Sequence, residues 1–220
     1  MIVKQIISKT IPALKPSDTV IKALNWMETF KITHLPIMLN NDYLGLISET
    51  DLLDIDNNKP IIDNKLIIND IYITDIQHIY DAINVFTDNK LSLLPVLDSN
   101  KNYLGYIILN DLVVAIKQIT SIDELGGIII LEISQNDYTL TEIANIVESE
   151  NIKIISLHTS INVKNQKLDI TIKFNTDEIL PIIKSFERYN YNIKAVFSNN
   201  KKSDEFYNDR LDELMFYLNI

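Results

Sequence analysis

Apolar residues recur at helical spacing in two places in the first half of the chain. The first stripe follows the helix-start residues Ser17 and Asp18 and consists of Val20, Ala23, Leu24 and Met27. The second stripe lies 59 positions further along and consists of Ile79, Ala82, Ile83 and Phe86. Each has the i, i+3, i+4, i+7 spacing of an amphipathic helix, so the pattern predicts one helix in each place.

A nearly constant offset also relates the segments that follow the two stripes. The 59-residue shift carries residues 34–37 onto 93–96, and one extra residue within 98–101 lengthens the shift to 60. The longer shift carries the tripeptide Tyr-Leu-Gly at 43–45 onto the same tripeptide at 103–105. Matches at a nearly fixed offset over this length indicate an internal duplication.

Each copy predicts the order helix, strand, polar turn, strand, helix. The strands are expected at 35–39, 43–47, 94–97 and 103–108. Neither copy alone covers the apolar strands that it contains, so the two are expected to pack against each other as a pseudo-two-fold pair. The predicted fold class is α/β (α+β), with one copy over 1–60 and the other over 61–120.

The second strand of each copy runs directly into the start of a helix. In the first copy this corner holds Ser48 and Asp51, and free backbone N–H groups at a helix start favour a polar or anionic ligand. The same residues are typical of a helix capping box, which requires no ligand, so binding and capping remain alternatives. In the second copy Ile108 replaces the hydroxyl residue, so a second site at Asp111 is incomplete, and Asn110 is expected to cap that helix.

Composition and charge narrow the class of protein. The chain has 220 residues, a formal net charge of −10 and a sequence pI of about 4.7, which argues against nucleic acid or an anionic membrane surface as a partner. It contains no cysteine, which excludes disulfides and thiolate metal sites. No segment has the apolar length of a signal peptide or a membrane span, so a cytoplasmic protein without membrane insertion is expected.

No catalytic motif is apparent in the sequence. The three histidines at 34, 78 and 158 are not paired at metal-ligand spacing, and neither a glycine-rich phosphate loop nor a nucleophile elbow occurs. His34 is expected to be a packed residue at the edge of a strand. We therefore expect neither an enzyme nor a resident cofactor or metal.

The duplicated segments carry a resemblance to a known family. The helix, His34-Leu-Pro-Ile, Tyr43-Leu-Gly-Leu-Ile and Ser48-x-x-Asp51 together resemble a CBS motif, and the tandem resembles a Bateman module over about 1–120. This resemblance implies an adenosine-containing ligand, such as AMP, ADP, ATP or S-adenosylmethionine, with phosphate near Ser48 and ribose hydroxyls on Asp51. It also implies adenine contacts, approximately, at Thr10, Ile11, Pro12, Leu35, Pro36 and Ile37.

After a linker at 121–126, the chain predicts a different order of elements. The four strands are expected at 128–133, 152–160, 168–174 and 193–198. One helix is expected behind a capping box from Thr139 to Glu142, and another with Pro181 in its first turn. This βαββαβ order is that of the ferredoxin-like fold.

The segment 127–198 resembles an ACT domain. That family carries a glycine in the loop between its first strand and first helix, where an amino-acid effector approaches the backbone. Here the bulky Tyr138 takes that place, which favours a dimerising domain over an amino-acid site. The combination is similar to acetoin-utilisation-type CBS–ACT regulatory proteins.

The tail, 199–220, predicts an amphipathic helix that docks on its own domain or on a second copy of the chain. Its apolar face consists of Tyr207, Leu211, Leu214, Met215 and Leu218. The leading hypothesis is a non-catalytic, homodimeric regulatory protein that senses an adenosine nucleotide or S-adenosylmethionine. The alternative is a ligand-free dimerising scaffold that docks on a partner protein, such as an enzyme or a transporter.

Overall fold

The computed structural model describes residues 1–53, 55–56, 59–63, 68–163 and 165–199. The chain divides into two compact units, Met1–Ile119 and Thr120–Ile220, and each is described by itself. The tail helix predicted within 203–220 lies outside the described residues.

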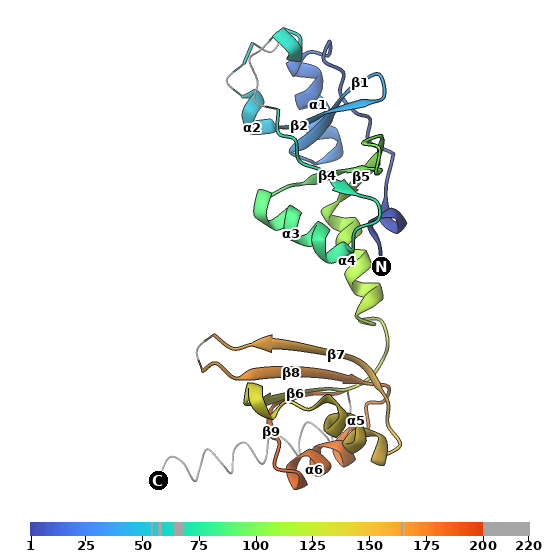
Figure 1. Cartoon of the computed structure of the whole chain (residues 1–220), viewed down its shortest axis with the longest axis vertical. Helices are drawn as coiled ribbons and strands as arrows, with labels where there is room; N and C mark the ends of the chain where they lie inside the picture. The colour runs from blue at the N-terminus through green and yellow to red at the C-terminus, as the bar shows by residue number, and fades with distance from the viewer. Residues whose placement is uncertain (54, 57–58, 64–67, 164, 200–220) are drawn as a thin grey trace. The chain divides into compact units, whose positions relative to one another are not determined.

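Two matching sets of elements make up the first unit (Figure 1). The first set is α1 (Val20–Phe30), β1 (His34–Leu39), β2 (Asp42–Ser48) and α2 (Glu49–Leu52). The second set is β3 (Ile73–Thr74), α3 (Ile79–Asn89), β4 (Leu93–Leu97), β5 (Tyr103–Ile108) and α4 (Leu109–Ile119). Short 3-10 turns occupy Val3–Ile6 (η1) and Ile61–Asp63 (η2). Since β1–β2 and β4–β5 are matching antiparallel hairpins, the predicted duplication is confirmed.

An approximate two-fold axis relates the hairpins of the two repeats. Tyr43 and Tyr103 occupy equivalent positions, and their rings stack with centroids 6.4 Å apart and planes 9° from parallel. The preceding residues, Asp42 and Asn102, form an antiparallel bridge with each other. Contacts between equivalent positions are those expected where a symmetry axis passes, so the pseudo-two-fold pairing is confirmed.

Each hairpin is completed by a short segment from the N-terminal part of the other repeat. Ser8 pairs with Tyr106 of β5 through backbone N–H···O contacts of 2.8 and 3.0 Å. Asn69 pairs in the same way with Leu46 of β2, at 2.8 and 3.1 Å. We call residues 7–9 and 68–70 the crossing segments, because each adds backbone hydrogen bonds to the sheet of the opposite repeat.

Glycine allows the close approach of the crossing segments. Gly45 and Gly105 have φ of +143° and +144°, a backbone conformation that disfavours other residues. A Cβ atom at Gly105 would lie 2.5 Å from the Ser8 carbonyl oxygen, and one at Gly45 would lie 2.9 Å from the Asn69 carbonyl oxygen. The matching glycines of the repeat are therefore required by the strand pairing itself.

One hydrophobic core serves both repeats. A single buried cluster takes side chains from the first repeat, such as Leu35 and Ile47, and from the second, such as Leu94 and Ile107. Each of these side chains is fully buried and contributes about 1.5–3 kcal/mol to folding. Neither repeat has a separate core, which agrees with the expectation that the two pack together.

The starts of α1 and α4 and the length of α2 differ from the sequence expectation. The N-cap of α1 is Thr19, while Asp18 accepts a hydrogen bond from the Lys15 backbone and pairs with Lys22. The second helix of the first repeat, α2, has four residues, too few for a substantial dipole. Asn110 lies inside α4 and does not cap it, because that helix already begins at Leu109.

The second unit forms one antiparallel sheet with two helices on one face (Figure 1). Its elements are β6 (Ile128–Ile133), η3 (Gln135–Asp137), α5 (Leu140–Ser149), β7 (Ile154–Ile161), β8 (Leu168–Phe174), α6 (Leu180–Arg188) and β9 (Asn192–Phe197). The strand order β7-β8-β6-β9, with every neighbouring pair antiparallel, is the ferredoxin-like topology and confirms that prediction. The ACT assignment and the likeness to acetoin-utilisation proteins stay predictions.

Of the two helix-start features predicted for the second unit, the one for α6 is confirmed and the one for α5 is wrong. Pro181 lies in the first turn of α6, as expected. Thr139 precedes α5, but its side chain makes no capping hydrogen bond, so the predicted capping box does not form. Tyr138 packs against the core of the unit.

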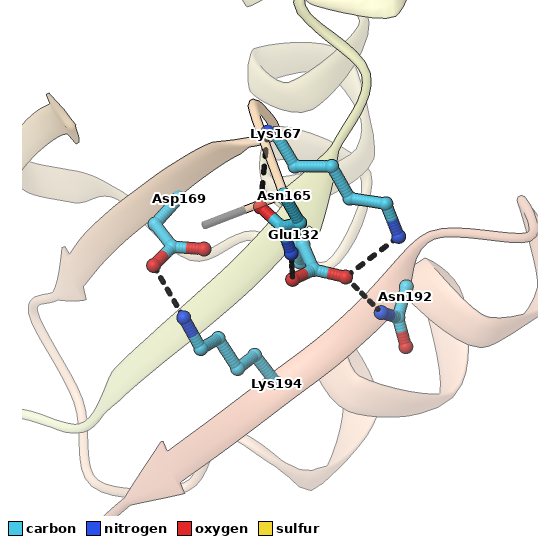
Figure 2. Close-up of polar contacts among 6 residues, drawn as sticks. All are labelled: Glu132, Asn165, Lys167, Asp169, Asn192 and Lys194. Atoms are coloured by element: carbon cyan, nitrogen blue, oxygen red, sulfur yellow. Dashed lines mark hydrogen bonds and ion pairs between the residues drawn. The ribbon is translucent and has the colours of Figure 1, made fainter. Parts of the chain in front are cut away.

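The sheet face opposite α5 and α6 carries a polar network at one end (Figure 2). Glu132 of β6 accepts hydrogen bonds from Lys167 (2.8 Å), Asn165 (2.8 Å) and Asn192 (3.3 Å). The hydrogen bonds from Lys167 and Asn165 lower the pKa of the Glu132 carboxyl group. Lys194 forms an ion pair with Asp169 beside them.

Candidate functional site

The polar corner of the first repeat is a closed hydrogen-bonded unit. The Ser48 backbone N–H donates to Oδ2 of Asp51 at 3.0 Å, and the Asp51 N–H donates to Oγ of Ser48 at 3.2 Å. The Ser48 hydroxyl also donates to the same carboxylate oxygen at 2.6 Å, and the Thr50 hydroxyl lies 2.8 Å from Oγ. Ser48 and Asp51 therefore form the predicted capping box, while Oδ1 of Asp51 has no partner within the described residues.

A cavity of about 550 Å³ opens beside this corner. Its lining comes from both repeats and consists of Thr33, His34, Leu46, Ser48, Glu49, Thr50, Asp51, Asn69, Ile71, Asn89, Lys90 and Leu91. The corner contributes hydroxyl and carboxylate groups, and the second repeat contributes both polar side chains (Asn69, Asn89, Lys90) and aliphatic ones (Ile71, Leu91). We call this space the Ser48 cavity.

His34 is the cross-strand neighbour of Ser48. The β1–β2 register pairs the two residues directly, which places their side chains on the same face of the hairpin. Burial lowers the pKa of His34, and the nearby Asp51 carboxylate partly opposes that shift. Its Nδ1 atom lies 3.0 Å from Oγ1 of Thr33 and 3.2 Å from Oγ of Ser92.

The charged groups of the Ser48 cavity nearly balance. Glu49 and Asp51 supply two carboxylates, and Lys90, at the end of α3, supplies one ammonium group. With His34 neutral, the lining carries a net charge of about −1 at neutral pH. Such a wall suits a ligand with few negative charges better than a triphosphate.

The corner of the second repeat has a different composition. Asp111 accepts a hydrogen bond from the Ile108 backbone N–H at 3.2 Å, as Asp51 does from Ser48. Ile108 has no hydroxyl group, and Ser8 of the crossing segment supplies one in its place. The Ser8 hydroxyl donates to the same oxygen of Asp111 at 3.4 Å. The cross-strand neighbour of Ile108 is Leu93, so an apolar pair stands where the first repeat has His34 and Ser48.

The remaining predicted ligand contacts do not line the Ser48 cavity. Ile11 donates its backbone N–H to the Tyr106 hydroxyl at 2.7 Å, so the 10–12 segment lies beside β5, the strand that leads to Asp111. Leu35, Pro36 and Ile37 are buried in β1 and belong to the core. Their roles as adenine contacts stay predictions.

Sequence reasoning missed the residues that the second repeat contributes to the Ser48 cavity. Asn69 and Ile71 reach it from the crossing segment and the residues just after it, and Leu91 from the loop between α3 and β4. The repeat offset is the one sequence signal that could have found them. Asn69 occupies nearly the same position in the second repeat as Ser8 does in the first.

A larger hollow of about 840 Å³ lies near the hairpin turns. Lys15, Asn40 and Asn102 are among the residues that line it. Most of the residues that line it are exposed, and neither polar corner contributes to it. We therefore place the candidate site in the Ser48 cavity.

Metal-binding clusters and membrane-spanning helices are both absent from the part of the chain that the structure describes. No group of three or more His, Asp or Glu side chains there is arranged to hold a metal ion. None of the described helices is long and apolar enough to cross a lipid bilayer.

Comparisons with known proteins point to one family. A family model described as CBS domain matches residues 3–58 and 64–118. Over 109 residues the chain is 27% identical to an inosine-5'-monophosphate dehydrogenase of Methanocaldococcus jannaschii, a match that covers 49% of this chain and 22% of that protein. The chain thus spans about a fifth of that curated relative.

Solved structures with similar folds include a CBS domain pair/ACT domain protein from Thermotoga maritima, with 24% identity and a TM-score of 0.49 over 54% of this chain and 98% of that one. They also include CBSX2 in complex with AMP, with 26% identity and a TM-score of 0.47 over 54% and 97%. The family assignment rests on the family model, which covers just over half of the sequence in two consecutive copies. The chain belongs to the CBS domain family.

Proposed function

We propose that this chain is a non-catalytic regulatory protein that binds an adenosine-containing ligand in the Ser48 cavity. One observation carries the proposal: the polar corner of the first repeat and residues of the second repeat line one space of about 550 Å³. A ligand in that space contacts both repeats at once. Binding therefore favours whichever arrangement of the pair fits the ligand better.

The chemistry of the lining suits a nucleoside. Oδ1 of Asp51 has no hydrogen-bond partner among the described residues, and a carboxylate oxygen accepts hydrogen bonds from vicinal ribose hydroxyls. Ile71, Leu91 and Leu46 supply apolar surface for a purine ring. The excess of one carboxylate supports a nucleoside, AMP or the cationic S-adenosylmethionine in preference to ATP.

Calorimetric titration with adenosine, AMP, ADP, ATP and S-adenosylmethionine tests this function. We expect at least one of them to bind, and Asp51→Ala to weaken that binding by about tenfold or more, the usual effect of losing hydrogen bonds to a charged group. Glu28→Ala, which removes an exposed carboxylate from α1 away from the cavity, is the matched control and should bind as the wild type does. Absence of heat at millimolar concentrations of all five ligands contradicts the proposal.

A dimerising scaffold without a ligand is the second candidate function. It is favoured by one observation, the closed hydrogen bonding of Ser48 and Asp51 to each other, which needs no ligand. Both functions include a homodimer, so light scattering that shows a monomer contradicts that part of each. Capture of a stable partner protein that is indifferent to all five ligands favours the scaffold.

A further inference from the structure

The first repeat carries a polar cross-strand pair where the second carries an apolar one. His34 faces Ser48 across β1 and β2, whereas Leu93 faces Ile108 across β4 and β5. Both polar residues line the Ser48 cavity. Ser48 is occupied by the capping box, which leaves the imidazole of His34 as the less engaged member of the pair.

The hydrogen bonds of His34 define which ring nitrogen carries the proton. The backbone N–H of Ser92 points at Nδ1 from 3.3 Å, and an N–H group can only donate. In the neutral ring Nδ1 is therefore the acceptor, and the proton resides on Nε2. Nε2 has no hydrogen-bond partner within the described residues, so its N–H group remains available to a ligand in the cavity.

The charge of His34 changes the charge of the whole lining. The other charged groups of the cavity are Glu49 and Asp51 on α2 and Lys90 at the end of α3, while Ser48 on β2 and Ser92 beside β4 are neutral. With a neutral imidazole the lining has one carboxylate in excess. Protonation removes that excess, and it also ends the acceptor role of Nδ1 toward the Ser92 N–H.

We infer that His34 contacts the ligand and that its protonation selects the ligand's charge. The neutral ring donates one hydrogen bond and favours an uncharged nucleoside, whereas the protonated ring favours the same nucleoside with a phosphate group. This inference rests on the proposed function of the Ser48 cavity. Because burial lowers the pKa of His34, the change of preference lies on the acidic side of the ordinary histidine range.

The test compares adenosine and AMP as ligands of the wild type and of the variant His34→Leu. Leucine is chosen because it is the residue at the equivalent position of the second repeat, Leu93. Calorimetry at about pH 8 and about pH 5 spans the ordinary histidine pKa and the acidic range below it. For the wild type, we expect the affinity for AMP relative to adenosine to rise about tenfold on acidification, a common size for coupling between two charges in one site. The phosphate of AMP also titrates near pH 6, which affects both proteins equally. The change in relative affinity measured for His34→Leu therefore gives the phosphate contribution, and the remaining change in the wild type belongs to His34.

Each outcome decides between the alternatives. Equal pH dependence in the wild type and His34→Leu overturns the inference and leaves the proposed function intact. A wild type that binds neither adenosine nor AMP also overturns the inference, and the proposed function then depends on the titrations with ADP, ATP and S-adenosylmethionine. If His34→Leu does not fold, His34→Gln replaces it, and its preference between adenosine and AMP should change with pH only as far as titration of the AMP phosphate changes it. Nitrogen NMR of the imidazole gives a separate readout: a neutral ring with its proton on Nδ1 contradicts the assignment.

Discussion

The two strand-to-helix corners have the same backbone and different chemistry. Both join an antiparallel hairpin to a helix, and both use an aspartate to accept the N–H group three residues earlier. At the first corner the neighbouring side chains are His34 and Ser48, and at the second they are Leu93 and Ile108. The comparison teaches that one backbone geometry can present different chemistry in the two copies. Under the proposed function, the cross-strand pair decides which of the two corners suits a polar ligand.

The largest effects should come from the glycines that admit the crossing segments. We expect Gly105→Ala to lower the free energy of unfolding by about 3 kcal/mol, because its Cβ meets the Ser8 carbonyl and its φ is unfavourable for alanine. Gly45→Ala should cost a similar amount, about 3 kcal/mol, because its Cβ would lie 2.9 Å from the Asn69 carbonyl oxygen and closer still to the branch methyl Cγ2 of Ile68, at an equally unfavourable φ. Urea denaturation followed by fluorescence of Trp26, the chain's single tryptophan, reports on the first unit. Equal stability of Gly105→Ala and the exposed control Glu28→Ala contradicts this view of the strand pairing.

The capping serine should have the next largest effect. Ser48→Ala removes the acceptor for the Asp51 N–H and a donor to its carboxylate, so we expect a loss of about 1 kcal/mol in the same denaturation experiment. Ser17→Ala, at an exposed position, should leave the stability unchanged. A Ser48→Ala protein as stable as the wild type means that the capping box contributes nothing to folding.

The hydroxyl supplied to the second corner should matter less. Ser8 donates to Asp111 over 3.4 Å, a longer contact than the 2.6 Å one between Ser48 and Asp51. We therefore expect Ser8→Ala to cost about 0.5 kcal/mol, roughly half the effect of Ser48→Ala. If the two substitutions cost the same, the borrowed hydroxyl fully replaces the missing one, and the corners are more alike than their sequences suggest.

The smallest effect should be the pH dependence that His34 gives to folding. Burial lowers the pKa of His34 in the folded protein, so between the folded and unfolded values the unfolded chain binds more protons, and stability falls as the pH decreases. We expect the wild type to lose about 0.5 kcal/mol or less through this residue between about pH 7 and about pH 5, because water screens a half-exposed ring. Denaturation of His34→Leu at both pH values isolates the contribution, since all other titrating groups are shared. An identical pH profile for the two proteins contradicts it.

The sequence predicted the elements of both units well, because their patterns are local. The four predicted strands of the first unit begin and end within one residue of the expected places, whereas β3 was not predicted, and the order of elements in the second unit is the expected one. The crossing segments were not foreseen. Their partners lie far away in the chain, and nothing within residues 7–9 or 68–70 marks them as strand-forming.

The candidate site was predicted in part, for a similar reason. Ser48 and Asp51 stand in a recognisable local motif, and the structure places both on one cavity. His34 was expected only to pack, because its pairing with Ser48 depends on the hairpin register and not on sequence distance. Asn69 and Ile71 line the Ser48 cavity because the chain crosses from one repeat to the sheet of the other. Composition and periodicity do not predict such a crossing.

The crossing segments also limit how such a duplication can change over time. Each repeat owes part of its sheet to backbone that is encoded beside the other, so neither copy is a complete folding unit. Deleting one copy would leave the strand edge of the remaining copy without its partner segment, and that edge would then be able to pair with another molecule. A gene that loses half of this pair is therefore expected to yield an exchanged dimer or an aggregate, and not a smaller working domain.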